Sequence, residues 1–237
     1  ALETALVREP DASDAWAALS IARLDEHRFP RTTETDPAAL DAALHAARRA
    51  VACDAENAFA HQALAMAHFF RREFDDFHIA APRAVALNPA HADVLADIGL
   101  CHCLHGEWSQ GLPLVDRALA ISPRSTGWYH LPRAMHHALQ GDFAAALHAV
   151  KSWPMPGFVW SEAHTAWFLA ELGRHAESQA ALQQLRLLHP GFEPSLARQL
   201  ERWCVCDAIA SAALAGWRKA GLAIGEVRIQ PFTRTRG

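Results

Sequence analysis

Residues Ala92–Pro123, ADVLADIGLCHCLHGEWSQGLPLVDRALAISP, repeat the spacing of the preceding stretch Ala58–Pro89, AFAHQALAMAHFFRREFDDFHIAAPRAVALNP, at an interval of 34 positions. Counted from the first residue of each stretch, a large apolar residue falls at position 7, a small residue at position 8, histidine at position 11 and proline at position 32. A fixed internal period of this length is the sequence signature of a repeated supersecondary unit.

The repeated pattern predicts a pair of antiparallel helices in each unit. The small residue, Ala65 or Gly99, lets the second helix approach the first closely, and the large residues beside it interlock between the helices. The closing proline, Pro89 or Pro123, ends the second helix because it lacks an N–H and its ring clashes with the preceding turn. We therefore expect an all-α fold, an α-solenoid of stacked helix pairs.

Three further units follow the same pattern with defects, which gives about five helix pairs over residues 14–192. The first unit contains Trp16 and carries the insertion FPRTTETDP before its second helix. The fourth unit is cut short by WPMPGF, and the fifth closes at Pro190. The interrupted units are expected to keep the helix-pair architecture, because each retains apolar residues at helical spacing.

The ends of the chain fall outside these five units. Residues 193–222 read as two more helices that cap the stack, since a terminal repeat needs a covered outer face. Residues 223–237 lack a helical period and predict a loosely ordered tail. Residues 1–13 resemble the end of a preceding helical repeat, which predicts either that the protein continues upstream of Ala1 or that an initiator methionine has been removed.

These units resemble the tetratricopeptide repeat. The segments MPGFVW, GWYH and LAGWRKAGL further resemble the carboxy-terminal repeat region of bacterial multidomain signalling proteins, in which a class III nucleotide cyclase, winged-helix or TolB-like domain precedes the repeats. The resemblance covers the chain from about Asp14 to Leu222. It implies a non-catalytic protein–protein interaction or regulatory module, and it supplies no catalytic residue for this region.

Composition excludes several classes of function. A formal net charge of -4, with Lys151 and Lys219 as the only lysines, is unsuited to a phosphate backbone, so no nucleic-acid partner is expected. No apolar run reaches the roughly 18 residues that a membrane span needs. The 5 cysteines are an odd number, and the spacing of the two Cys-x-Cys pairs is unsuited to disulfide bridging. Reduced thiols and a cytoplasmic protein are therefore expected. Because no nucleophile elbow, phosphate loop, dinucleotide fingerprint or HExxH motif occurs, neither an enzyme nor a cofactor is expected.

A cluster of cysteine and histidine in the third unit raises the alternative of a metal or small-molecule sensor. Cys101 and His105 are four residues apart on one helical face, and Asp97 lies a further turn back on the same face. Three such ligands can bind an ion opportunistically, but no second cluster at structural-zinc spacing accompanies them. Since buried cysteine commonly behaves as a small apolar residue, no physiological metal is expected here.

Histidine also recurs at one repeat position, as His68, His102 and His136. Equivalent residues on stacked helix pairs are separated by at least the roughly 8–10 Å of helix packing, so this column cannot hold one ion. Packing in an aromatic slot is the expected role. Asp75 and Asp76 fall at the start of a second helix, where acidic side chains favour the positive end of the helix dipole.

The candidate binding surface is the concave wall formed by the first helices. By resemblance to tetratricopeptide proteins, that wall is lined through positions 2, 5, 9, 12 and 13 of each unit. The candidate residues at these positions are mainly apolar and aromatic: Phe59, Gln62, Met66, Phe69, Phe70, Leu100, Leu104, His130, His137, Trp160 and Trp167. Lysine and asparagine, with which chaperone-binding members of the family clamp a terminal carboxylate, are absent from these positions.

An apolar wall has two explanations, which the sequence leaves open. It receives an extended or helical segment of a protein or peptide partner, or of a neighbouring domain, as apolar grooves receive amphipathic helices. Alternatively, the chain's own carboxy-terminal helices curl in and fill it. A homo-oligomer is compatible with either explanation.

Overall fold

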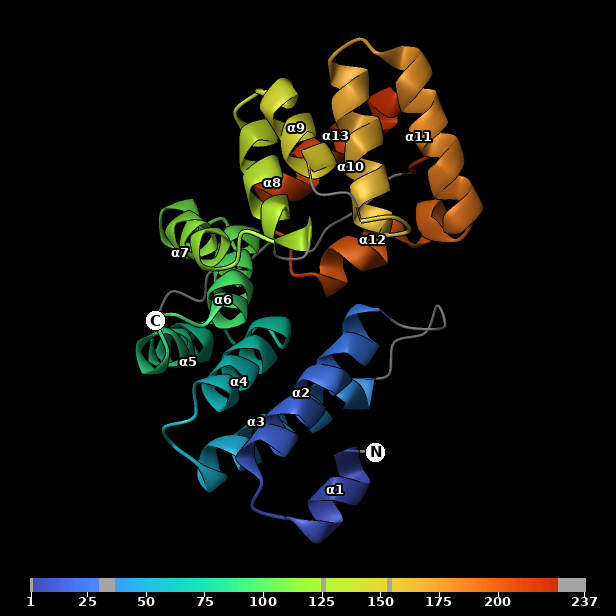
Figure 1. Cartoon of the computed structure of the whole chain (residues 1–237). Helices are drawn as coiled ribbons and strands as arrows, with labels where there is room; N and C mark the ends of the chain where they lie inside the picture. The colour runs from blue at the N-terminus through green and yellow to red at the C-terminus, as the bar shows by residue number, and fades with distance from the viewer. Residues whose placement is uncertain (1, 30–36, 125–126, 153–154, 226–237) are drawn as a thin grey trace. The chain divides into compact units, whose positions relative to one another are not determined.

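The computed structural model describes residues 2–29, 37–124, 127–152 and 155–225, and every regular element in these ranges is helical (Figure 1). The expectation of an all-α fold built from helix pairs is therefore confirmed. The chain divides into two compact units. Unit 1 comprises residues 1–101, 116–122 and 202–204, and unit 2 comprises residues 102–115, 123–201 and 205–237.

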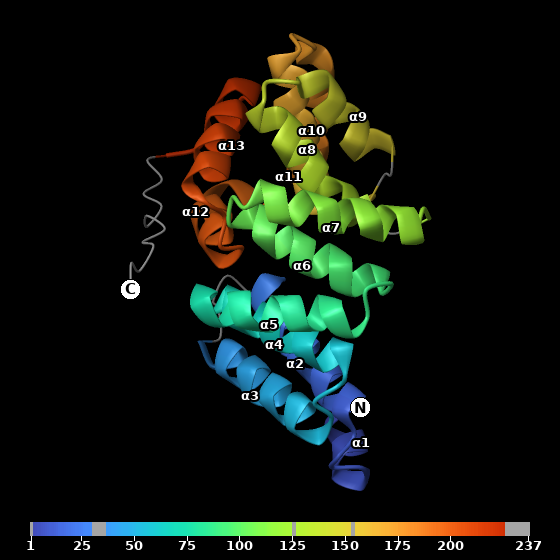
Figure 2. The same ribbon diagram turned by 90° about the vertical axis from the view of Figure 1, so that its left-hand side faces the viewer.

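Unit 1 is built on two antiparallel helix pairs, α2 with α3 and α4 with α5, and α3 also packs beside α4 (Figure 2). Most of the core between α2, α3 and α4 is alanine, including Ala17, Ala47 and Ala63, each fully buried. Small side chains let helix backbones approach closely, as the repeat pattern predicted. The helices are α1 (Leu2–Arg8), α2 (Ser13–Arg28), α3 (Pro37–Cys53), α4 (Ala58–Phe70) and α5 (Phe74–Leu87).

The division between the units passes through α6 (Ala92–Leu104) and α7 (Trp108–Ile121). Within unit 2, α8 pairs with α9 and α10 pairs with α11, and the chain continues into two further helices. Its elements are the 3-10 helix η1 (Gly127–His130), α8 (Leu131–Leu139), α9 (Phe143–Ser152), α10 (Val159–Glu171), α11 (His175–Leu188), α12 (Phe192–Arg202) and α13 (Asp207–Ala220).

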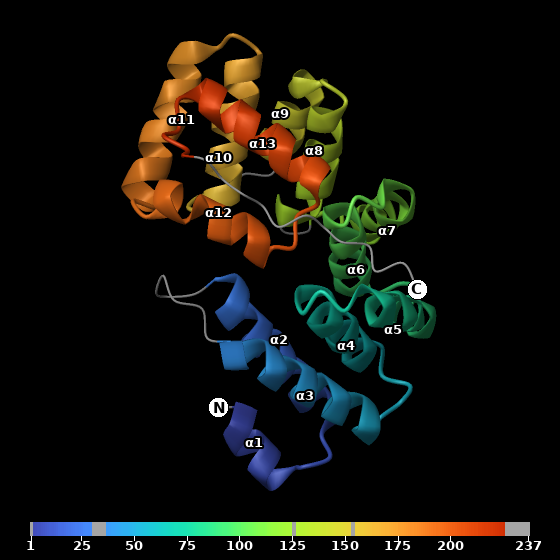
Figure 3. The same ribbon diagram turned by 180° about the vertical axis from the view of Figure 1, so that it is seen from behind.

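The last helix, α13, lies across α10 and also contacts α8 and α11 (Figure 3). The close approach is possible at Gly216, where a Cβ atom would lie only 1.8 Å from Nε1 of Trp167. The neighbouring Trp217 is fully buried, and its indole N–H donates to the carbonyl of Ala163 at 2.9 Å. Helix α13 therefore packs on the first helices of the repeats in unit 2.

The turn after each first helix is the same in four repeats. A backbone N–H donates to the carbonyl five residues earlier, in the manner of a Schellman turn, and the residue before that N–H has a positive φ. The donor and acceptor pairs are Glu73 and His68, Glu107 and His102, Asp142 and His137, and Arg174 and Leu169, with distances of 2.8–2.9 Å. The residues with positive φ are Arg72, Gly106, Gly141 and Gly173.

This turn corrects the predicted histidine column. In the fourth repeat, His137 and not His136 holds the place of His68 and His102, because the sequence there carries one residue more before the turn. The count of 34 positions therefore assigns His130 and His137 to repeat positions that are one too high. Residues 30–36, within the FPRTTETDP insertion, and residues 226–237 of the tail lie outside the described ranges. Among the helices that are described, none is both long and apolar enough to cross a bilayer.

Candidate functional site

The candidate wall residues are largely buried in the folded chain. Only Phe59, His130 and His137 are half-buried rather than buried. The other eight are buried: Gln62, Met66, Phe69, Phe70, Leu100, Leu104, Trp160 and Trp167. A partner could reach these eight side chains only by displacing what covers them.

In unit 1 the cover over Phe70 is the short segment that follows α12. The rings of Phe70 and Trp203 meet edge to face with their centroids 6.1 Å apart. The centroid of the Phe29 ring lies 5.4 Å from that of Trp203. The guanidinium of Arg28 lies 5.4 Å from the Phe70 centroid and 5.8 Å from that of Trp203, which suits a cation–π contact. The thiol of Cys204 approaches the carbonyl of Phe70 at 3.8 Å. Residues 202–204 therefore close this part of the wall.

In unit 2 the cover is α13. The centroid of the Trp217 ring lies 6.1 Å from that of Trp160 and 6.2 Å from that of Trp167. The ring of His164 belongs to the same cluster. Burial lowers the pKa of His164 to about 4, against the effect of its hydrogen bond to the carbonyl of Trp160. A neutral imidazole thus packs among the aromatic rings. At Phe70, Trp160 and Trp167, the geometry favours filling of the wall by the chain itself.

The three candidate metal ligands have separate surroundings, and His105 lies in the turn that follows α6 rather than on the helix itself. Asp97 accepts a hydrogen bond from Nε2 of Gln62 at 2.6 Å, and desolvation raises its pKa to about 6 despite the nearby charge of Arg28. Cys101 is buried, and Nδ1 of His105 lies 3.1 Å from a carboxylate oxygen of Glu107. Where ligand atoms do converge within the described ranges, the groups do not include Asp97, Cys101 or His105.

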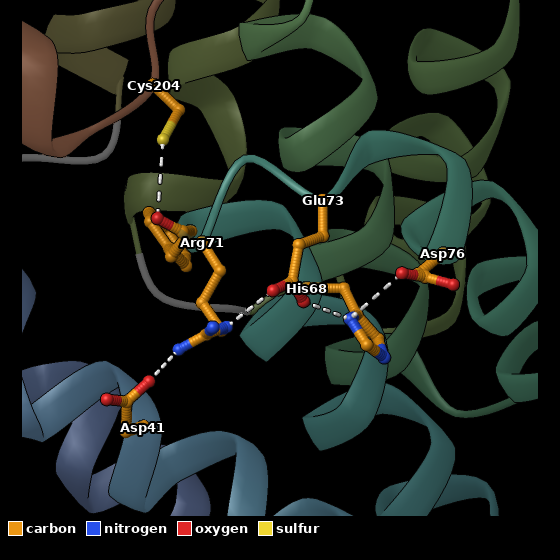
Figure 4. Close-up of polar contacts among 7 residues, drawn as sticks. Asp41, His68, Arg71, Glu73, Asp76 and Cys204 are labelled. Atoms are coloured by element: carbon orange, nitrogen blue, oxygen red, sulfur yellow. Dashed lines mark hydrogen bonds and ion pairs between the residues drawn. The ribbon is translucent and has the colours of Figure 1, made fainter. Parts of the chain in front are cut away.

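A different trio converges at the turn between α4 and α5 (Figure 4). Nδ1 of His68 lies 2.7 Å from Oε2 of Glu73 and 3.9 Å from Oδ2 of Asp76. One ligand atom from each residue lies within 4.8 Å of the others. The imidazole is buried with 8% of its side chain exposed, whereas the carboxylate of Asp76 is 59% exposed. The cluster is therefore buried on the side of His68 and accessible to solvent on the side of Asp76.

Arg71 holds the carboxylate of this cluster from its other side. Its Nε donates to Oε1 of Glu73 at 2.8 Å, and its guanidinium also forms an ion pair with Asp41 (Figure 4). Burial alone would raise the pKa of Glu73, but the hydrogen bonds from His68 and Arg71 outweigh it and lower that pKa. Glu73 is therefore an ionised carboxylate in a fixed orientation.

Sequence reasoning missed this cluster because it treated His68 as a packing residue and Asp76 as a helix-start residue. The available signal was the repeated His-x4-Glu spacing. Nδ1 of His102 lies 2.6 Å from Oε2 of Glu107, as in the preceding repeat. In that next repeat, the neutral side chain of Gln110 stands at the place of Asp76.

An open groove occupies the other end of α4. Its volume is about 690 Å³, and all of its lining residues belong to unit 1. It lies where the α3–α4 turn meets the end of α5 and the start of α2. The lining residues are Asp14, Ala18, Asp54, Glu56, Asn57, Ala58, Phe59, Leu87, Asn88 and His91.

Hydrogen bonds of the Asn57 side chain hold several lining residues of this groove in place. The Asn57 side-chain oxygen caps α4 by accepting from the N–H groups of Phe59 and Ala60. Its Nδ2 donates to Oδ1 of Asp14 at 2.6 Å and to the hydroxyl of Ser13 at 2.9 Å. One residue thus joins the start of α2 to the start of α4 and holds a carboxylate at the groove.

The groove is acidic with a small apolar surface. Asp14, Asp54 and Glu56 supply three carboxylates, and no lysine or arginine is among the lining residues. Arg83, from outside the lining, forms an ion pair with Glu56. Phe59 and His91 supply the aromatic rings of the lining. Phe59 was predicted as a candidate residue from the sequence, but the three acids were not, because Asp14 is distant in the sequence from Asp54 and Glu56.

Comparisons with known proteins support the fold. No family model matches the chain, and no curated protein matches it. Among solved structures, YrrB, described as a TPR protein with an unusual peptide-binding site, shares 14% identity at a TM-score of 0.50, over 84% of this chain and 97% of its own. PilF of Pseudomonas aeruginosa shares 16% identity at a TM-score of 0.64, over 87% of this chain and 90% of its own.

A third similar structure is the APC/C hetero-tetramer Cut9–Hcn1. It matches at 14% identity and a TM-score of 0.66, over 93% of this chain and 42% of the other chain. At such identities the likeness concerns the fold alone. The chain therefore has the architecture of a tetratricopeptide-repeat protein.

Proposed function

We propose that the chain is a non-catalytic protein-interaction module that binds an extended, basic segment of a partner protein in the acidic groove of unit 1. The observation that carries this proposal is the contrast between the two candidate surfaces. The apolar wall is covered at Phe70, Trp160 and Trp167, whereas the groove beside Asn57 is open. The tetratricopeptide architecture supports the general class of function.

Charge complementarity defines the occupant. The lining offers three carboxylates and no cationic side chain, so a lysine or arginine of a partner would be attracted and an acidic side chain repelled. The aliphatic part of that side chain would lie against Phe59 while its charged end reaches Asp14 or Asp54, since long basic side chains combine an apolar stem with a polar head. A phosphorylated or acidic segment does not fit this groove.

The module would act on an output domain attached to it in the same protein. The resemblance of the sequence to the repeat region of bacterial signalling proteins supports a role in the cytoplasm, in which partner binding changes the activity of an attached output domain. The attached domain could also supply the basic segment itself. In that case binding within one protein replaces binding between two.

The proposal is tested with a fluorescently labelled peptide of alternating alanine and arginine, and with its counterpart in which glutamate replaces arginine. Fluorescence polarisation should show binding of the arginine peptide alone, weakening as salt is added. The double variant Asp14→Asn with Asp54→Asn should weaken binding about 2- to 30-fold, because an exposed ion pair contributes about 0.2–1 kcal/mol. Both asparagines retain an oxygen that can accept the hydrogen bonds of the native carboxylates.

The matched control is Glu9→Gln with Asp11→Asn, which removes the same charge from exposed residues of unit 1 outside the lining. It should weaken binding much less than the groove variant does. Equal weakening by the two double variants would indicate attraction by net charge alone. That result, or equal binding of the two peptides, would contradict the proposed site.

A further inference from the structure

We propose that His68, Glu73 and Asp76 form a binding site for a zinc-type divalent cation. The cluster lies at the carboxy-terminal end of α4, whereas the acidic groove lies at the amino-terminal end of the same helix. A helix of 13 residues is about 20 Å long, so the two sites are separate. Metal binding at this cluster can therefore be tested separately from peptide binding in the acidic groove.

The donor set determines the class of ion. One imidazole nitrogen and two carboxylate oxygens are ligands that zinc accepts in proteins, commonly with water at a fourth position. Calcium and magnesium prefer sites made of oxygen alone. The 59% exposed side chain of Asp76 leaves the open side of the cluster accessible to an ion and to water.

The distances require only small adjustments. Zinc bonds of about 2.0–2.2 Å place neighbouring ligand atoms of a tetrahedron about 3.4 Å apart. The present separations from Nδ1 of His68, 2.7 Å to Glu73 and 3.9 Å to Asp76, lie on either side of that value. Movement of two carboxylates by less than about 1 Å would admit the ion, with Nδ1 of His68 deprotonated.

The surroundings orient the ligands as a metal site requires. Arg71 donates to the oxygen of Glu73 that faces away from His68, so the second oxygen remains directed at the imidazole (Figure 4). Hydrogen-bonded partners of this kind fix the orientation of ligating carboxylates. The ion would join the last turn of α4 to the first turn of α5. Its binding should therefore stabilise this helix pair against unfolding.

The test is a calorimetric titration of the chelator-treated full chain with zinc chloride, with magnesium chloride as a comparison. The wild-type chain should bind one zinc ion at this site and no magnesium. Asp76→Asn should weaken that zinc binding at least tenfold, because even a residue that only orients a ligand typically contributes 10- to 100-fold. Because Asp76 is exposed, the variant should keep the helical circular dichroism of the wild type.

Asp75→Asn is the matched control, since Asp75 is an exposed acid in the same first turn but is not part of the cluster. Zinc affinity in this variant should stay within twofold of wild type. Absence of zinc binding, or a loss in Asp76→Asn no greater than in Asp75→Asn, would overturn the proposal. A Glu73→Gln variant should show the same loss as Asp76→Asn, and normal zinc binding in it would also overturn the site.

Discussion

Substitution of Gly216 by alanine tests whether α13 packs on α10 as closely as the structure shows. In most helix interiors this change stabilises a protein by about 0.5–1 kcal/mol, because glycine loses more backbone freedom on folding. At Gly216 the new Cβ would lie 1.8 Å from Nε1 and 1.9 Å from Cδ1 of Trp167. Real Cβ atoms do not approach other heavy atoms so closely, so either the helix or the ring must move.

The cost of that movement decides the sign of the effect. Trp167 is only 3% exposed, and its ring is surrounded by the rings of His164, Phe168 and Trp217. Overpacking of a filled core costs about 1–3 kcal/mol, and here a rigid ring meets the backbone of a helix, which favours the upper end. After the gain from helix propensity, we expect Gly216→Ala to lower the free energy of unfolding by about 2 kcal/mol.

Urea denaturation followed by circular dichroism measures this difference. Ser211→Ala, on an exposed position of the same helix, is the control and should leave the unfolding free energy equal to or slightly above that of wild type. If Gly216→Ala proves as stable as wild type, α13 does not lie against Trp167 at this distance. Coverage of the wall in unit 2 by α13 would then be contradicted.

Two further substitutions test other parts of the structure. The pKa of His164 is about 4 in the folded chain and about 6.5 in the unfolded chain. Acidification from pH 6.5 to 4 should therefore protonate the unfolded chain first and lower the free energy of unfolding by up to about 3 kcal/mol. Urea titrations at pH 7 and pH 4.5 should show a smaller decrease for His164→Gln than for wild type, and an equal decrease would contradict the assignment. Asn57→Ala removes the cap of α4 and the bond to Asp14, which should cost about 1–2 kcal/mol in thermal or urea unfolding, and a loss below 0.5 kcal/mol would show that these bonds contribute little.

The helix pairs could be predicted from the sequence because their determinants are local and periodic. Small residues such as Ala65 and Gly99, and the closing prolines Pro89 and Pro123, recur at a fixed interval and specify two packed helices wherever they occur. The error at His136 has a physical cause, since one additional residue before the turn shifts the register without disturbing either helix. Counting by 34 detects the repeat but not such a shift.

The candidate site was less predictable because it depends on contacts between distant segments. Nothing in the sequence near Phe70 shows that Trp203 covers it, and nothing near Trp167 shows that Gly216 allows a helix to approach. The acidic groove combines Asp14 with Asp54 and Glu56, which become neighbours only through the packing of α2 beside α4. The apolar positions indicated a wall that is covered either by a partner or by the chain itself, and only the packing of distant segments distinguishes the two.

The most direct test of the account locates the bound peptide on the protein. Backbone amide NMR signals of the isotopically labelled chain would be followed during titration with the alanine–arginine peptide. We predict that the largest shifts occur in the lining of the acidic groove, at Asp54–Phe59 and Leu87–His91, with little change at Phe70, Trp160 and Trp167. Largest shifts at those three wall residues, with the groove signals unchanged, would contradict the central claim that the open acidic groove, and not the covered wall, binds the partner.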